Sequence, residues 1–376
     1  MTRKHGNKLK TKVIIFIPSL NVGGAENVVR QLAINLDRQK FDCHVCCITE
    51  EGVFANSIHE AGVPVKAFNK KSRWDVFVWF KVYRFLKELA PCIVHSFLFT
   101  AGFWVSIPAF LAADVLPIYS IRSIYGQNPK WVAFLEKFFI LPFSKRITFV
   151  SHNALESYLR KQPSLGRKSV VIPNGVDLAK FGQTNVTPHN NRIIAVGRLD
   201  KAKGYDILLR AYQVVKEQRP SSTLVIVGEG SCREKLELLA QELGLDPKAI
   251  FIGQSQNIPQ LLSSSSIYVS ASLWEGIPNS HLEAMASGKA IVATAVGGVP
   301  EILDSESALL IASKNVGELA RAIIALLDNP DLRERLSNHA LERVNKEFSL
   351  DRMIFNHENF YQDLMKGLEK NRELIQ

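Results

Sequence analysis

Two segments in the second half of the chain combine charged residues in spacings that suit a phosphorylated ligand. In VGRLDKAKG at 196–204, Arg198 follows a predicted strand and Lys203 precedes a predicted helix. Both cations can converge on one diphosphate there, because a helix N-terminus also favours negative charge. The alternative is that both are solvated surface charges. The combination favours a diphosphate site.

The second segment, 270–288, reads SASLWEGIPNSHLEAMASG and carries two carboxylates. Glu275 lies in a Gly/Pro loop, and Glu283 lies eight residues later in a short predicted helix. A carboxylate can accept two hydrogen bonds from a vicinal diol, so the two residues can hold separate hydroxyl-bearing parts of one ligand. They could instead be the acid and base of a glycosidase, where their separation decides the stereochemistry. The sequence leaves both possibilities open.

Glycine-containing turns follow three predicted strands, at Gly23-Gly24, at Gly197 and at Gly228-Glu229-Gly230. Glycine after a parallel strand lets backbone amides approach a ligand. The complete G-x-G-x-x-G fingerprint is missing, which argues against NAD binding. A lone histidine, His95, also ends a predicted strand.

Short apolar runs alternate with helical patterns along the chain, which is typical of βαβ units and predicts an α/β fold with parallel sheets. The predicted strands form two sets: 13–17, 44–49, 92–95, 118–121 and 146–150, then 192–196, 223–227, 250–252, 267–269 and 290–293. Predicted helices include 26–36, 76–89 and 206–217. Each set is large enough for a doubly wound sheet. We therefore expect an N-terminal domain at 1–180, a polar linker at 181–191 and a C-terminal domain at 192–347, with the site in the cleft between the domains.

Composition excludes a disordered or fibrous chain, since 47% of the 376 residues are hydrophobic and 22% are charged. The net charge of +10 is uneven, because residues 1–180 hold 25 basic and 12 acidic residues. Five cysteines, an odd number, favour a reducing compartment. The N-terminus lacks the apolar length of a signal peptide, and the uncharged stretch 97–113 contains Pro108 and reads as a buried helix.

The basic N-terminal half indicates an anionic partner, either a membrane surface or nucleic acid. No nucleic-acid-binding motif is present, so we expect no nucleic acid. A candidate surface for an anionic membrane combines basic and aromatic residues, although the aromatic residues could equally belong to the core. Its members are Arg3, Lys4, Lys8, Lys10, Lys12, Lys70, Lys71, Arg73, Trp74, Phe77, Trp79 and Phe80.

Several motifs, in order along nearly the whole chain, resemble the retaining glycosyltransferases of family 4. They are GGAE at 23–26, VHSF at 94–97, VIPNGVD at 171–177, VGRLDKAKG at 196–204, GEG at 228–230, E-x7-E at 275–283 and GGVPEI at 297–302. The resemblance implies the GT-B fold, in which two Rossmann-like doubly wound domains face a cleft. It also implies that the C-terminal segment, 348–376, forms a helix that packs back on the N-terminal domain.

The resemblance further implies roles for individual residues. Arg198 and Lys203 would bind the donor diphosphate and stabilise the departing nucleotide. Glu283 would hold the ribose hydroxyls, and Glu275 would position the sugar. The other implied donor-binding residues are Gly23, Gly24, Gly276, Ile277, Pro278 and Asn279. His95 would lie beside the transferred sugar, near its reacting carbon.

The activity implied is metal-independent transfer of a hexose or N-acetylhexosamine from a nucleotide sugar, with UDP expected, to a glycan or lipid-linked glycan in cell-surface polysaccharide synthesis. No D-x-D motif occurs in the chain, and no metal or other cofactor is expected. The sequence EGIPN at 275–279 replaces the common EGFGL, which leaves the sugar open. A cytoplasmic location, peripheral on the inner face of the membrane, would fit. The alternatives are a GT-B sugar-nucleotide epimerase and a two-domain sugar-binding protein.

Overall fold

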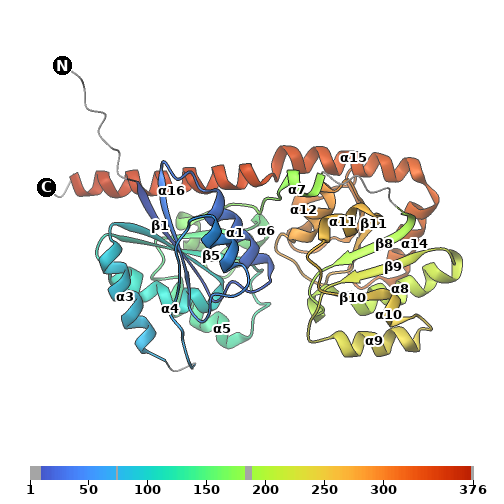
Figure 1. The fold of residues 1–376 in the computed structure, drawn as a ribbon, viewed down its shortest axis with the longest axis horizontal. Coiled ribbons are helices and arrows are strands. Elements are labelled where there is room, and N and C mark those ends of the chain that lie inside the picture. Colours follow the sequence, from blue (N-terminus) through green and yellow to red (C-terminus); the bar gives the residue numbers. More distant parts are fainter. Residues whose placement is uncertain (1–9, 73–74, 183–188, 374–376) are drawn as a thin grey trace, which may run out of the picture. The chain divides into compact units, whose positions relative to one another are not determined.

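The computed structural model describes residues 10–72, 75–182 and 189–373, with side chains up to residue 367. The chain divides into two compact units (Figure 1). Unit 1 comprises residues 1–173 and 353–376, and unit 2 comprises residues 174–352. Each unit is an α/β layer structure around one parallel sheet, as the alternating pattern predicts.

The sheet of unit 1 has seven parallel strands in the order β3-β2-β1-β4-β5-β6-β7. Its strands are β1 (Thr11–Ile17), β2 (Phe41–Cys47), β3 (Val65–Ala67), β4 (Cys92–Phe97), β5 (Val115–Ile121), β6 (Arg146–Phe149) and β7 (Ser169–Val171). The central strands are continuous apolar runs because helices cover both faces of the sheet. β1, for example, is fully buried from Val13 to Ile17.

The helices of unit 1 are α1 (Gly24–Asn35), α2 (Ala55–Glu60), α3 (Phe77–Leu89), α4 (Leu98–Leu111), α5 (Lys130–Leu135), the π-helix η1 (Glu136–Ile140), α6 (His152–Leu159) and the 3₁₀ helix η2 (Pro163–Lys168). α4 confirms the predicted buried helix, and it packs between α3 and η1. Among the described residues, no helix is both long and apolar enough to cross a membrane.

Unit 2 has six parallel strands in the order β10-β9-β8-β11-β12-β13. They are β8 (His189–Val196), β9 (Thr223–Val227), β10 (Phe251–Gly253), β11 (Ser265–Ser270), β12 (Ala290–Thr294) and β13 (Leu309–Ile311). The helices are α7 (Leu178–Gly182), the 3₁₀ turn η3 (Lys201–Lys203), α8 (Tyr205–Gln218), α9 (Arg233–Glu242), α10 (Pro247–Ile250), α11 (Ile258–Ser263), α12 (Asn279–Ala286), α13 (Val299–Ile302), α14 (Val316–Asp328) and α15 (Pro330–Glu347).

The unit boundaries differ from the expected ones. Unit 2 begins at Asn174, and both ends of the expected linker belong to regular elements, because α7 contains residues 181–182 and β8 begins at His189. The residues between them lie outside the described part of the chain. The last helix, α16 (Leu350–Glu373), belongs to unit 1 from Met353 onward. It begins beside Val176, whose backbone bonds Phe348 and Leu350.

Candidate functional site

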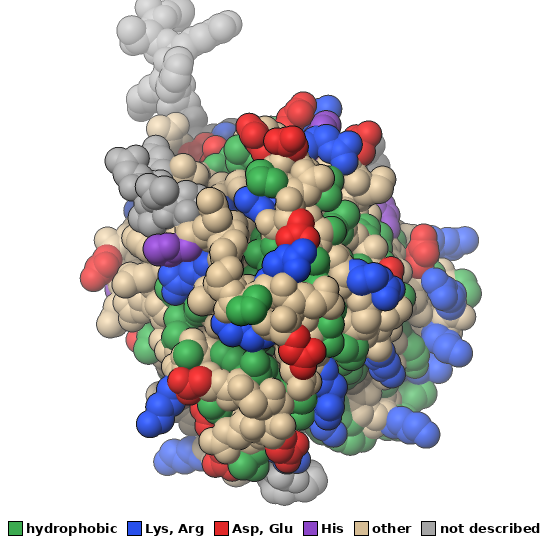
Figure 2. All heavy atoms as spheres, turned by 90° about the vertical axis from the view of Figure 1, so that its right-hand side faces the viewer, with side chains coloured by type: hydrophobic (Ala, Val, Ile, Leu, Met, Phe, Trp, Pro, Cys, Tyr) green, Lys and Arg blue, Asp and Glu red, His purple; other side chains and the backbone are tan. Residues whose placement is uncertain are grey.

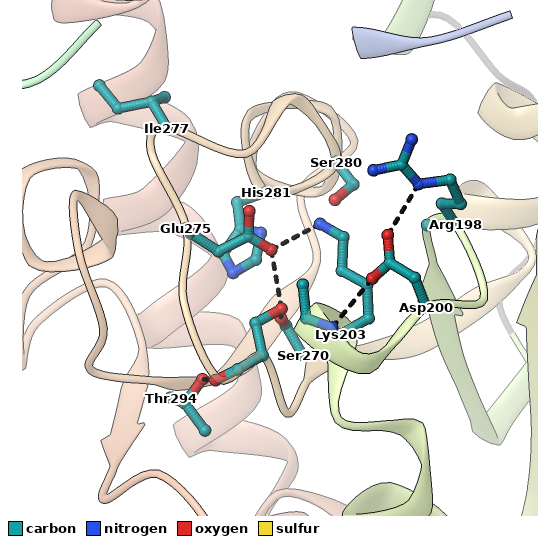
Figure 3. A network of polar contacts seen from close by, with 12 residues as sticks. Arg198, Asp200, Lys203, Ser270, Glu275, Ile277, Ser280, His281 and Thr294 are labelled. Carbon is teal, nitrogen blue, oxygen red and sulfur yellow. Dashed lines mark hydrogen bonds and ion pairs between the residues drawn. The ribbon is translucent and has the colours of Figure 1, made fainter. Parts of the chain in front are cut away.

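The charged segments of unit 2 lie at the switch point of its sheet. Along the chain the strands run outward from β8 to β10 on one side and from β11 to β13 on the other. In sheets of this kind, ligands bind beyond the carboxyl ends of the strands where the order reverses. The loops that follow β8 and β11 carry Arg198, Lys203 and Glu275 (Figure 3). The fold therefore brings these three predicted residues together.

The two cations of the β8 loop are held differently. The Arg198 side chain is 78% exposed, and its Nε donates to Asp200 Oδ2 at 2.7 Å. The other oxygen of Asp200 accepts from the Ala202 amide at 3.0 Å and caps the turn that carries Lys203. Asp200 therefore positions both cations, a role that sequence reasoning did not assign. The sequence signal for this role was the position of Asp200 between Arg198 and Lys203.

Lys203 reaches across to the β11 loop. Its Nζ donates to Glu275 Oε1 at 2.5 Å, and the Glu275 side chain is 11% exposed. The same oxygen accepts from Ser272 Oγ at 2.7 Å. Thr294 lies at the end of β12, and its hydroxyl group donates to the Ser272 carbonyl at 2.6 Å. This hydrogen bond fixes the position of the loop that follows β11. Ser272 was part of the predicted motif, but only the fold shows its contact with Glu275.

Glycines allow the loops at this switch point to touch through their backbones. Gly204 adopts a left-handed φ of +59°, and a Cβ there would lie 2.2 Å from the Ala271 carbonyl oxygen. A Cβ on Gly228 would lie 2.0 Å from the Gly197 carbonyl oxygen. The amide of Leu273 also bonds the Ala202 carbonyl at 2.7 Å. At Gly204 and Gly228, glycine thus makes room for a neighbouring loop. The expected approach of a ligand to the Gly228 turn stays a prediction.

The loop Gly276–Asn279, which was predicted to bind the donor, leads into α12 and is anchored by a residue from the start of unit 2. Asn174 Nδ2 donates to the Ile277 carbonyl at 3.0 Å and to Asn279 Oδ1 at 2.7 Å. The Ile277 side chain is buried, and Pro278 is the N-cap of the helix. Asn174 belongs to the VIPNGVD motif, whose contact with this loop could not be read from the sequence.

α12 carries two titratable groups that face different surroundings. Burial raises the pKa of Glu283 to about 7, an effect that Lys180 partly offsets. His281 is fully buried, and burial together with the charge of Lys203 lowers its pKa to about 3. Its Nδ1 lies 3.3 Å from Tyr268 Oη, whereas its Nε2 has no partner among the described residues. His281 is therefore a buried, neutral imidazole near Lys203, and it was missed because sequence reasoning gave roles only to its neighbours.

In unit 1 the predicted glycines also lie at a switch point, between β1 and β4. Gly23 caps α1, and Gly24 is the first residue of that helix. A Cβ on Gly23 would lie 2.1 Å from the Glu26 carboxylate. Arg122 follows β5 at the same edge, its guanidinium 5.8 Å from the centre of the Phe97 ring. A cation directly after a predicted strand was the signal for Arg122, and sequence reasoning did not use it.

His95 lies in the interior of unit 1. Its side chain is fully buried in unit 1, and its Nδ1 lies 2.8 Å from Tyr361 Oη. Its Nε2 lies 3.2 Å from Thr148 Oγ1, and burial lowers its pKa well below the usual value. With both ring nitrogens engaged and no exposed atoms, His95 is a structural residue in this conformation. This burial argues against the expectation that His95 lies beside the transferred sugar, which stays a prediction.

Comparison with known proteins matches both halves of the chain to glycosyltransferase families. Residues 22–180 match the family described as Glycosyltransferase Family 4, and residues 178–343 match the family described as Glycosyl transferases group 1. A relative from Haemophilus influenzae, described as an uncharacterized glycosyltransferase, is 32% identical. That match covers 91% of this chain and 98% of the relative.

Two relatives that match over most of their own length have names that state a reaction. The N-acetylgalactosamine-N,N'-diacetylbacillosaminyl-diphospho-undecaprenol 4-alpha-N-acetylgalactosaminyltransferase of Campylobacter jejuni is 27% identical over 89% of this chain and 94% of its own. The UDP-Gal:alpha-D-GlcNAc-diphosphoundecaprenol alpha-1,3-galactosyltransferase of Escherichia coli is 24% identical over 96% of this chain and 98% of its own. Among solved structures, Anabaena HepE in complex with UDP and glucose superposes with a TM-score of 0.84 at 19% identity, covering 94% of this chain and 99% of HepE.

Proposed function

This chain belongs to the family 4 glycosyltransferases, which adopt the GT-B fold, and on that premise we propose that it is a retaining, metal-independent enzyme that uses a UDP-sugar. The proposed reaction transfers a hexose or an N-acetylhexosamine to a lipid-linked glycan. The observation that carries the proposal is the convergence of Arg198, Lys203 and Glu275 at the switch point of unit 2.

In the proposed reaction, the bond between the anomeric carbon and the diphosphate oxygen breaks, and negative charge develops on the departing UDP. Lys203 and Arg198 stabilise that charge, an effect that is large when the cations are already in place. Glu275 and Asp200 hold the two cations before the donor arrives. The acceptor oxygen bonds to the anomeric carbon from the same face, and its proton passes to the departing phosphate oxygen.

The same residues support the proposal of metal independence. An arginine fork and a lysine can neutralise a diphosphate, which is the role that a divalent cation takes in other nucleotide-sugar sites. The chain also lacks the D-x-D motif that would clamp such a cation. We therefore propose that a metal chelator leaves the transfer rate unchanged. The implied donor-binding roles of Gly23, Gly24 and the 276–279 loop remain predictions.

The relatives with named reactions guide the choice of substrates. Both act on diphospho-undecaprenol-linked acceptors, and both make an α linkage. UDP-galactose and UDP-N-acetylgalactosamine carry an α-linked sugar, so an α product means retention. We propose the same acceptor class here and place the enzyme at the inner face of the cytoplasmic membrane, where nucleotide sugars and such acceptors meet. Galactose and the N-acetylhexosamines are the candidate sugars.

The test is a transfer assay with the purified full chain. UDP-galactose, UDP-N-acetylgalactosamine and UDP-N-acetylglucosamine are each supplied with a short-chain polyprenyl-diphosphate-linked N-acetylglucosamine, with and without EDTA. We expect one donor to give an α-linked product, identified by its NMR coupling constant, at the same rate in EDTA. A β-linked product would refute retention, and loss of activity in EDTA would refute metal independence. Conversion of the UDP-sugar without an elongated acceptor would favour the epimerase.

A further inference from the structure

The short helical segment formed by α5 and η1 exposes aromatic rings to solvent and buries its carboxylate, which is unusual for a surface helix. Trp131, Phe134 and Phe138 are between 51% and 59% exposed. The carboxylate of the segment, Glu136, points inward and is 3% exposed. Surface helices normally bury their rings and expose their carboxylates. The polarity of this segment is therefore inverted.

The inward position of Glu136 is stabilised by specific partners. Tyr119 Oη and Tyr158 Oη each donate to one Glu136 oxygen at 2.7 Å. Burial raises the pKa of the carboxyl group, against the effect of these two hydrogen bonds. A buried carboxyl group is costly unless it is hydrogen-bonded, and this one is satisfied by residues of β5 and α6. The inversion is thus built into the packing of unit 1.

The exposed rings continue onto neighbouring helices. α3 packs against α4, and α4 packs against η1 (Figure 1). Aromatic rings on these helices contact one another in a continuous series, with ring centroids 5.3 to 6.1 Å apart. The series runs from Trp104 and Trp79 through Phe103 and Phe99 to Trp131. On α3, Phe77 and Phe80 are exposed while Val78, Val82 and Leu86 face the core. We call the exposed set Phe77, Phe80, Trp131, Phe134 and Phe138 the aromatic face.

The charges around the aromatic face are almost all positive. The basic residues on α3, α5 and η1 are Lys81, Arg84, Lys87, Lys130 and Lys137, and the acidic residues are Glu88 and the inward Glu136. Arg84 lies 6.0 Å from the centre of the Phe80 ring, and Lys137 lies 5.5 Å from the centre of the Phe138 ring. By contrast, acidic and basic side chains are interspersed on the face of unit 2 drawn in Figure 2.

We propose that the aromatic face inserts into the interfacial layer of an anionic lipid bilayer, with the surrounding lysines and arginines on the lipid headgroups. Exposed rings next to cations are typical of segments that lie in the membrane plane, and each cation near an anionic surface adds to the attraction. The inference extends the proposed function, whose acceptor is lipid-linked. It differs from the surface predicted from sequence, because Trp79 is packed among rings and α5 and η1 are added. Five members of the predicted surface lie outside the described residues: Arg3, Lys4, Lys8, Arg73 and Trp74.

The test compares vesicle binding of the full chain and a triple variant, Trp131→Ser with Phe134→Ser and Phe138→Ser. The vesicles contain phosphatidylcholine with roughly a third phosphatidylglycerol, and binding is measured by co-sedimentation. We expect the triple variant to bind at least about tenfold more weakly. The matched control is Leu238→Ser with Phe355→Ser, because these residues are 59% and 62% exposed. The control should bind like the wild type. Thermal melting shows whether each variant is folded.

A second measurement does not depend on the triple variant. Brominated lipids should quench the fluorescence of the wild type more than that of Trp131→Phe, because Trp131 enters the bilayer. Transfer to a short-chain acceptor in detergent should be unchanged in the triple variant, which separates failure of this inference from failure of the proposed function. Equal binding by wild type and triple variant, or equal quenching of wild type and Trp131→Phe, would overturn the inference. Self-association through these residues without vesicle binding would also overturn it, in favour of a second copy as the occupant.

Discussion

Lys203 and Glu275 form an ion pair that joins the two loops at the switch point of unit 2, with Nζ 2.5 Å from Oε1. Both side chains are largely buried, so their attraction is screened less than that of an exposed pair. Ser272 donates to the same carboxylate oxygen, which restricts the carboxylate to one position. The ammonium group is consequently aimed before any donor binds, which is the condition under which a cation stabilises a departing phosphate most.

Removing this ammonium group should therefore lower the rate of transfer. We expect Lys203→Ala to lower kcat/KM by about 10²- to 10³-fold, the range seen when one preorganised charge-stabilising group is lost. Lys201→Ala is the matched control, since Lys201 is exposed and lies in the same turn. Initial rates of sugar transfer are measured for both. An equal loss in the two variants would point to damage to the turn, and full activity in Lys203→Ala would remove Lys203 from the mechanism.

Glu283 should make UDP binding depend on pH. Its pKa is raised to about 7 by burial, and a carboxylate accepts ribose hydroxyl groups better than a protonated carboxyl group does. We expect the ratio of the UDP affinities of wild type and Glu283→Gln to increase as the pH rises through 7. Titration of the UDP phosphate cancels in this ratio. Calorimetric titrations between pH 5.5 and 8.5 measure it, and a constant ratio would contradict the assigned role.

The raised pKa of Glu283 should also make the stability of the ligand-free protein depend on pH. Stability should fall as the pH rises, whereas the relative UDP affinity should increase. The folded-state pKa is above the usual 4.5, so folding takes up a proton between these values. The stabilisation from Glu283 is complete below about 4.5 and is lost as the pH rises through about 7, a change of at most about 3 kcal/mol. The melting temperature of the wild type relative to Glu283→Gln should fall over this window. A difference that rises with pH would show that the carboxylate is stabilised.

The sequence predicted the central strands of both sheets because a strand buried on both faces is a continuous apolar run. It did not predict β3, β7 and β13, which have three residues each and are too short to show a period. On α3, composition alone could not separate exposed rings from buried ones. Only the packing of α4 against α3 decides that Phe77 and Phe80 are exposed and Val78 is buried.

The candidate site was predictable where chemistry and strand ends coincide. Arg198, Lys203 and Glu275 follow strands whose carboxyl ends meet at one edge, so their proximity could be inferred. The contacts of Asp200, Ser272 and Asn174 depend on loop conformations that no periodicity encodes. The burial of His95 could not be predicted, because its partner Tyr361 is 266 positions away in the chain.

Gly204 offers a direct test of how closely the two loops pack. Gly204 and Gly244 both have a left-handed φ, of +59° and +70°. An added Cβ would strain the backbone at both, by roughly 1 kcal/mol. Only at Gly204 would it also meet a backbone atom, at 2.2 Å, whereas nothing lies within 4 Å at Gly244. We expect Gly204→Ala to lower the melting temperature and the transfer rate well beyond Gly244→Ala. Equal effects would mean that the loops can separate without cost.

The hydrogen bond between His95 and Tyr361 should hold α16 on the sheet of unit 1 without a part in catalysis. Tyr361→Phe leaves a buried imidazole nitrogen without its partner, a loss of about 1–3 kcal/mol. Tyr83→Phe is the control, because the half-buried Tyr83 hydroxyl makes no hydrogen bond to a described residue. A double-mutant cycle with His95→Leu, followed by thermal unfolding, should give a coupling of about 0.5–3 kcal/mol. The pH dependence of transfer should be the same in Tyr361→Phe as in the wild type, since the pKa of His95 lies well below 6.5. A displaced pH profile, or additive effects of the two substitutions in the cycle, would contradict the structural role. Either result would favour a position of His95 beside the reacting sugar.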